Sequence, residues 1–366
     1  MTASTQRWAT EVSSVAIAGQ ALAYLLGVVL ARNLDVTGFE TYVVASAAFI
    51  LMVAIVPQGL EMYALRVVPP LLAQAQWEPV VGYLRFSARR TLWAAWLVGL
   101  VVGLWAWCAA GLAPSARIAM VISCASVPVG AMAHWGLEVL TALQRPLAAT
   151  VIFRIAVPAI TLAGVATLAL WGDALNGPAA VACWSISWGA GLVLMGWQIR
   201  RAAPHELQVA LAQEKPAEWR ANARPFWVYR ALLAVFAQIG VLVLDRLQPS
   251  PTTVAAFAVA ASTAGLAQVL ASATNRGYAS RLSVLLAQGN YDGIQVLQRQ
   301  RLQWLLPPIT VYLMGVLVFS KELIGFFRPA VIEEGVVPLR ILAVATARSV
   351  ALALSPAYAK FRGKKS

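Results

Sequence analysis

The chain has 366 residues, of which 60% are hydrophobic and only 12% charged, and its mean hydropathy is +0.72. A soluble domain averages roughly 45–50% apolar and about 25% charged residues, so this composition excludes a water-soluble protein. The net charge of +13 would suit a nucleic-acid partner, but the basic residues follow short loops between apolar stretches and form no single patch. We therefore expect helices in lipid and no nucleic-acid binding.

Ten apolar stretches reach the roughly 20 residues that a helix needs to cross a bilayer. The first is too long for a cleavable signal and is followed by charged residues rather than by small ones. The sequence therefore predicts an all-α, polytopic membrane protein with about ten transmembrane helices. In chain order the predicted spans are 9–31, 41–65, 91–111, 117–142, 148–171, 177–198, 225–244, 252–274, 304–327 and 334–357.

The loop charges predict how these spans are oriented. With the N-terminus in the cytoplasm, 21 of the 28 Lys and Arg residues fall on the cytoplasmic side and five on the outer side, while Arg340 and Arg348 lie inside the tenth span. Short cationic loops resist translocation, so both chain ends are expected on the cytoplasmic side of an inner (plasma) membrane.

An internal repeat relates the two halves of the chain at an offset of 214 residues. The segment LLAQ at 71–74 recurs at 285–288. Further pairs at this offset are Leu30/Leu244, Arg32/Arg246, Trp77/Tyr291 and Glu78/Asp292. Because the halves share one orientation, the repeat predicts two bundles related by an axis along the membrane normal, around a central cleft.

The repeat also predicts a domain division. We expect a six-helix N-terminal bundle at 1–200, a cytoplasmic linker at 201–224 and a four-helix C-terminal bundle at 225–366. At the repeat offset Ser366 corresponds to Ile152, so the second bundle is two helices shorter than the first.

The segment LARNLDVTGFETY at 30–42 resembles the first outer loop of polysaccharide (O-antigen-type) flippases. These belong to the multidrug/oligosaccharidyl-lipid/polysaccharide exporter superfamily, and their pattern is roughly LARxLGxxxFGxY. Asp35 and Glu40 stand where that pattern has glycines. Weaker matches follow in order: GLEVLTALQR at 136–145, LVLD at 242–245, RLSVLLAQGN at 281–290 and PLRIL at 338–342. Members of the family usually have twelve or fourteen spans in two bundles.

The resemblance implies a flippase that moves undecaprenyl-pyrophosphate-linked oligosaccharide across the inner membrane by alternating access. Its partners would be membrane lipid, this lipid-linked oligosaccharide and a polysaccharide polymerase complex. Such a transporter has no catalytic residues and no cofactor. A multidrug or cation antiporter of the same superfamily, and a shortened inactive relative, remain alternatives.

A pyrophosphate crossing hydrocarbon needs a wet, cation-lined cavity, so four intramembrane arginines are the candidate substrate-binding residues. Arg348 lies in the middle of the tenth span and is expected to face the cavity, with Arg340 eight residues earlier on a shared face. Arg154 and Arg230 enter the fifth and seventh spans from the cytoplasmic side. The competing interpretations are that Arg154, Arg230 and Arg340 extend to the membrane interface, and that Arg348 forms a structural ion pair with Glu138.

Four other ionisable residues are candidates for gating or coupling. His134 is the repeat counterpart of Arg348, and Glu138 lies one turn after it. Glu61 stands near the inner end of the second span and Asp245 at the outer end of the seventh.

No metal site is predicted, because the two histidines, His134 and His205, stand far apart without partner ligands. No phosphate-binding glycine loop or nucleophile motif is present. An integral-membrane glycosyltransferase or polymerase is the enzyme alternative, but it would favour a larger, acidic outer loop. We expect the protein not to be an enzyme.

Overall fold

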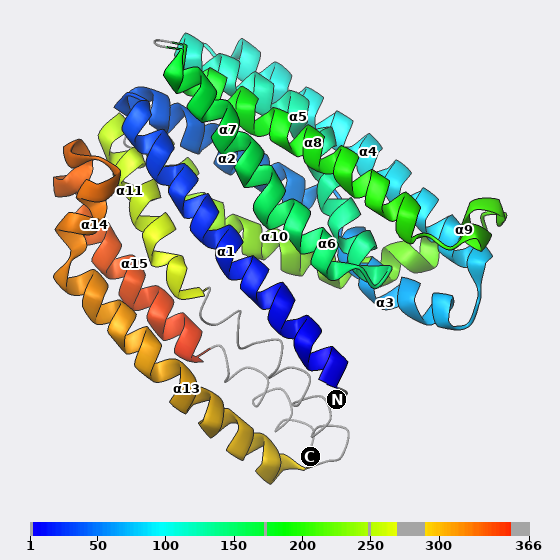
Figure 1. Ribbon diagram of the computed structural model, residues 1–366. Coiled ribbons are helices and arrows are strands. Elements are labelled where there is room, and N and C mark those ends of the chain that lie inside the picture. The colour runs from blue at the N-terminus through cyan, green and yellow to red at the C-terminus, as the bar shows by residue number, and fades with distance from the viewer. Residues whose placement is uncertain (1–2, 172–173, 248–249, 269–289, 353–366) are drawn as a thin grey trace. The chain divides into compact units, whose positions relative to one another are not determined.

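The computed structural model describes residues 3–171, 174–247, 250–268 and 290–352, and within these ranges the chain is helical with no strand (Figure 1). Eight described helical segments are long and apolar enough to cross a membrane. They are Glu11–Asn33, Val36–Ile55, Trp77–Cys108, Pro114–Ala142, Pro146–Leu170, Gly177–Ala202, Pro216–Leu247 and Tyr291–Val318. The expectation of an all-α, polytopic membrane protein is confirmed.

The first two helices, α1 (Ala3–Asn33) and α2 (Val36–Ile55), are joined by the outer-loop motif. Asp35 caps α2, because its Oδ1 accepts a hydrogen bond from the backbone N–H of Gly38 at 3.0 Å. The departure from glycine at this position therefore stabilises the start of a helix.

The predicted second span is wrong as one continuous helix. The chain turns at 56–59 and continues as α3 (Leu60–Ala73), with Gln58 at φ 55° and Gly59 at φ 76°. Apolar composition over 41–65 hid this break, since hydropathy does not report backbone direction. The predicted ninth span is likewise divided, at Phe319, into α13 (Tyr291–Val318) and α14 (Ser320–Phe327).

The remaining predicted spans correspond to helices with shifted ends. The third and fourth are α4 (Trp77–Cys108) and α5 (Pro114–Ala142), and the sixth is α8 (Gly177–Ala202). The fifth is α6 (Pro146–Val151), a π-helical turn η1 (Ile152–Ala156) and α7 (Val157–Leu170). The tenth is α15 (Ile332–Leu352), which follows the 3₁₀ turn η2 (Pro329–Val331) and is not among the eight membrane-length segments.

The predicted linker contains more structure than expected. It holds α9 (His205–Val209), and α10 (Pro216–Leu247) starts before the predicted seventh span at 225. The eighth span begins as α11 (Pro251–Ala264). Its later part, the repeated LLAQ segment at 285–288, Arg276, Arg281 and the C-terminal basic residues lie outside the described residues.

The helix boundaries follow the repeat offset. The ends of α1 and α10, Asn33 and Leu247, stand 214 residues apart, as do the starts of α4 and α13, Trp77 and Tyr291. The repeat therefore aligns helix with helix, although its residue matches are few.

The chain forms two compact units. Unit 2 spans Val29–Val254, and unit 1 combines Met1–Val28 with Ala255–Ser366. Most of α1 is thus grouped with the C-terminal helices and α10 with the N-terminal ones. The division into 1–200, 201–224 and 225–366 remains a prediction, and these units differ from it by the exchange of the first helix of each half.

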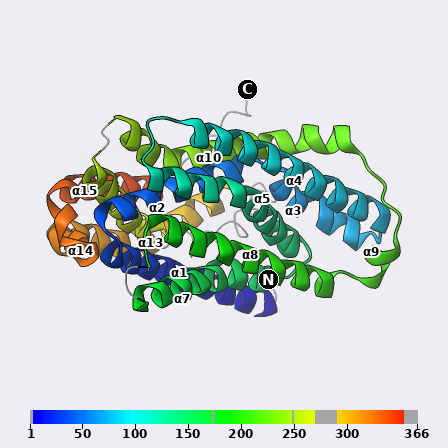
Figure 2. The same cartoon turned by 90° about the horizontal axis from the view of Figure 1, so that it is seen from above.

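In unit 2, α5 packs against α4 on one side and α8 on the other (Figures 1 and 2). Glycines permit close approach to α5: a Cβ on Gly99 of α4 would lie 2.6 Å from the carbonyl oxygen of Cys124, and one on Gly130 of α5 would overlap the ring of Phe49 on α2. Small residues let transmembrane helices pack closely where no hydrophobic effect draws them together.

In unit 1, α15 packs against α13 and α14. Tyr24 of α1 stacks edge-on with Phe327 at 5.0 Å between ring centroids. Its hydroxyl also lies 3.4 Å from that of Thr263, whose carbonyl accepts a hydrogen bond from Tyr312 at 2.7 Å. These contacts explain why α1 groups with the C-terminal helices.

Candidate functional site

At the break between α2 and α3, the backbone of α10 comes very close to that of the N-terminal helices. A Cβ on Gly59 would lie 2.4 Å from the backbone nitrogen of Trp227 and 2.5 Å from the carbonyl oxygen of Ala223. The indole N–H of Trp227 donates to the carbonyl of Ile55 at 2.9 Å. The break therefore leaves a carbonyl that α10 satisfies, in an environment where unpaired backbone groups are costly.

Arg230 lies farther along α10 and contacts groups from two other helices. Its Nη2 is 3.1 Å from Nδ1 of His134 on α5, and its Nε is 3.9 Å from Oε1 of Glu61 on α3. The side chain of Glu61 is 1% exposed and that of Arg230 27% exposed. Glu61 is thus an almost fully buried carboxylate, and the guanidinium of Arg230 lies near it but beyond normal hydrogen-bond distance.

His134 connects this pair to further charged and aromatic groups. Its ring stacks on Trp188 of α8 at 5.3 Å and meets Phe153 of η1 edge-on at 5.0 Å. Arg154 lies over the ring of Phe153, 5.5 Å from its centroid. Glu138, one turn after His134, lies within electrostatic range of Arg230 and Glu61. We call Arg230, Glu61, His134, Glu138 and Arg154 the Arg230 cluster.

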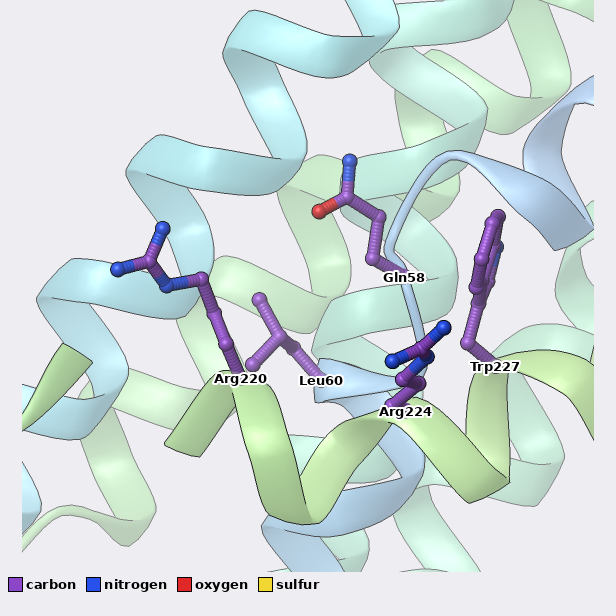
Figure 3. Close-up of a pocket in the computed structure, with 5 residues that line it drawn as sticks. All are labelled: Gln58, Leu60, Arg220, Arg224 and Trp227. Carbon is purple, nitrogen blue, oxygen red and sulfur yellow. The ribbon is translucent and has the colours of Figure 1, made fainter. Parts of the chain in front are cut away.

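A groove of about 280 Å³ opens beside the helix break (Figure 3). Arg220 and Arg224, one turn apart on α10, project along it with Trp227, while Gln58 and Leu60 come from the break and the start of α3. Nε of Arg90 on α4 donates to Oε1 of Gln58 at 3.2 Å. We call these six residues the cationic groove.

Solved structures of membrane transporters share this arrangement of helices. One is the inward-facing conformation of a multidrug resistance MATE family transporter of the MOP superfamily, with TM-score 0.63 and 12% identity over 92% of this chain and 81% of that chain. Another is the eukaryotic MATE transporter AtDTX14, with TM-score 0.54 and 13% identity over 96% and 81%. The chain has the fold of a MATE transporter. The sequence matches no protein-family model and no curated protein.

On this MATE-type fold, five of the eight predicted site residues come together. These are the members of the Arg230 cluster, two expected to bind substrate and three expected to gate or couple. Their roles remain predictions. The contact between Arg230 and His134 was not foreseen, because positions 96 residues apart carry no local signal for pairing.

The other three predicted residues lie elsewhere. Asp245 is at the far end of α10, near Glu40 of α2. Arg340 donates to Oγ of Ser320 at 3.0 Å and to the carbonyl of Leu317 at 3.4 Å, so it binds the junction of α13 and α14. Arg348 is exposed on α15 in unit 1, whereas Glu138 belongs to unit 2. Cavity-facing and ion-pair roles for Arg348 both remain predictions.

The cationic groove was not predicted from the sequence. Arg220 and Arg224 were counted only as linker charges, and Gln58 as part of a continuous span. The signal that was available is the pair Gln58-Gly59 between apolar stretches, since glycine beside a polar residue is typical of a turn. Among the described residues, no three His, Cys, Asp or Glu side chains gather closely enough to hold a metal ion.

Proposed function

We propose that this protein is a transporter that flips a pyrophosphate-linked, oligosaccharide-bearing lipid across an inner membrane by alternating access. The fold supports a transporter, and the MATE structures it resembles are transporters by description. The observation that carries the choice of cargo is that two arginines, Arg230 and Arg154, lie between helices in the Arg230 cluster. An anionic headgroup is expensive to hold in hydrocarbon without such cations.

The long contact between Arg230 and Glu61 gives a physical basis for a cargo-dependent switch. At 3.9 Å the two groups attract each other without a normal hydrogen bond, so a phosphate can compete for the guanidinium, which binds phosphate in a bidentate manner. Cargo binding would then leave Glu61 buried without its cation. A proton taken up by Glu61, or movement of α3 relative to α10, would relieve that cost.

The test is the fate of the lipid-linked glycan in a strain that lacks the gene. We expect the intermediate to accumulate on the inner leaflet, and the intact gene to restore its export. Arg230→Ala should restore less than about a tenth of export, because a charge-assisted contact with phosphate is worth roughly 1.5–3 kcal/mol. Arg200→Gln, an exposed arginine at the end of α8, should restore export fully. Normal export in the deletion strain would contradict the proposal.

A multidrug or cation antiporter is the second candidate. One observation in its favour is that Glu61 and Glu138 lie near Arg230, since carboxylates suit cationic substrates. Another is that a structural neighbour is described as a multidrug resistance transporter. Sensitivity of the same deletion strain to cationic dyes separates the two. Increased sensitivity with unchanged glycan export would favour the antiporter.

A further inference from the structure

We propose that the cationic groove is a binding site for the phosphate or pyrophosphate headgroup of a membrane amphiphile whose headgroup has a net negative charge. The proposal concerns Gln58, Leu60, Arg90, Arg220, Arg224 and Trp227, and it rests on their geometry rather than on the identity of the transported cargo.

The positive charges at the groove come from two helices, α10 and α4. Arg220 and Arg224 are one turn apart on α10, so they extend from the same face, as Figure 3 shows. Arg90 reaches the groove from α4 through its contact with Gln58 at 3.2 Å. Two guanidinium groups that line the groove, with a third that contacts its Gln58, form a poor environment for a cation and a good one for a phosphate, which accepts several N–H donors at once.

These arginines are not used in ion pairs within the described part of the chain. Arg220 donates from Nε to the carbonyl of Pro216 at 3.1 Å, and Arg90 donates to an amide oxygen. The neighbouring Arg89, by contrast, pairs with Glu214 at 3.2 Å. The groove therefore keeps its positive charge, while an adjacent arginine on the same helix is neutralised.

The surroundings suit a lipid more than a dissolved anion. Leu60 forms an apolar part of the lining, and Trp227 places an amphipathic ring at the edge of the groove, as is typical of a membrane interface. Past Trp227, α10 presents the exposed apolar side chains of Leu232, Leu233 and Phe236. A headgroup in the groove could thus leave its acyl or prenyl chain beside apolar surface.

Native mass spectrometry of the purified full-length protein in neutral detergent tests this site. The probes are farnesyl pyrophosphate and phosphatidylglycerol, with zwitterionic phosphatidylcholine as the reference. We expect Arg220→Gln/Arg224→Gln to weaken binding of at least one anionic probe by about tenfold or more, because each charge-assisted contact is worth roughly that factor. Phosphatidylcholine binding should not change.

The matched control is Arg200→Gln/Arg201→Gln, which removes two exposed arginines at the end of α8 and changes the net charge equally. It should bind both probes like the unaltered protein. Arg220 and Arg224 are exposed, so Arg220→Gln/Arg224→Gln should melt at the same temperature as the unaltered protein. The melting temperature of each variant is measured alongside binding.

The two anionic probes distinguish the sources of the headgroup. A selective loss of farnesyl pyrophosphate binding assigns the groove to prenyl pyrophosphates, and a loss of phosphatidylglycerol binding assigns it to bilayer phospholipid. Both results support a headgroup site, whether or not the protein exports a glycan. Equal losses in the two double variants, or no loss in either, would overturn it.

Discussion

Arg230 contacts two groups that attract it in different charge states: a neutral imidazole and a charged carboxylate. Nδ1 of His134, at 3.1 Å, can accept a hydrogen bond from the guanidinium only when the imidazole is neutral, whereas Glu61, at 3.9 Å, attracts it most when charged. Because Glu61 is 1% exposed, its charge depends on Arg230 for compensation. Removing one partner of such a pair costs more than the pair itself contributes.

The first prediction concerns this dependence. Arg230→Ala should lower the free energy of unfolding by about 2 kcal/mol, since it leaves a buried carboxylate without its cation. Arg230→Ala/Glu61→Gln should recover much of the loss, because the neutral amide needs no counter-charge. Thermal unfolding in detergent, followed by intrinsic fluorescence, measures both. Equal stability of the single and double variants would contradict a role for Glu61 in the loss.

At the scale of elements, the break between α2 and α3 decides how α10 packs. Gly59 has φ 76°, and the backbone of α10 occupies the space that a Cβ at this position would fill. Residues other than glycine, asparagine and aspartate rarely adopt this conformation. The turn, the hydrogen bond from Trp227 to the carbonyl of Ile55 and the cationic groove all depend on this one close approach.

The second prediction is that Gly59→Ala destabilises the protein by about 3 kcal/mol, through backbone strain and overpacking together. Gly189→Ala is the matched control, because a Cβ at this position in α8 meets no atom within 4 Å. It should leave stability unchanged or raise it slightly, since alanine favours a helix over glycine. The midpoint of thermal unfolding distinguishes the two. A Gly59→Ala protein as stable as the control would mean that α10 can shift at little cost.

For the whole molecule, the repeat and the exchange of first helices belong together. α1 and α10 end at equivalent positions, and each is grouped with the helices of the other half. The two halves of the sequence are therefore connected by these exchanged helices as well as by the segment at 203–215.

The third prediction tests the orientation of this assembly. In a background without Cys108, Cys124 and Cys183, a cysteine at Gly111, between α4 and α5, should react with a membrane-impermeant maleimide in intact cells. A cysteine at Glu206 in α9 should react only after the cells are permeabilised. The positive-inside rule requires this pattern, and the reverse labelling would contradict it.

The sequence by itself determined the class of the protein, because lipid solvation acts on each helix locally. Composition and apolar length were sufficient to predict a polytopic all-α protein, and the offset of 214 residues paired Leu30 with Leu244 and Arg32 with Arg246 near the outer ends of the first and seventh spans. The candidate residues of the Arg230 cluster were also found this way, since an ionisable side chain within an apolar stretch is conspicuous in any sequence.

The tertiary structure alone decided which of these residues meet. Arg230 contacts His134 and Glu61 because α10 packs against the N-terminal helices rather than the helices that follow it in the chain. The close approach of α10 to Gly59 is likewise a contact between distant segments. Both are results of packing between segments more than 90 residues apart, which neither hydropathy nor local propensity records.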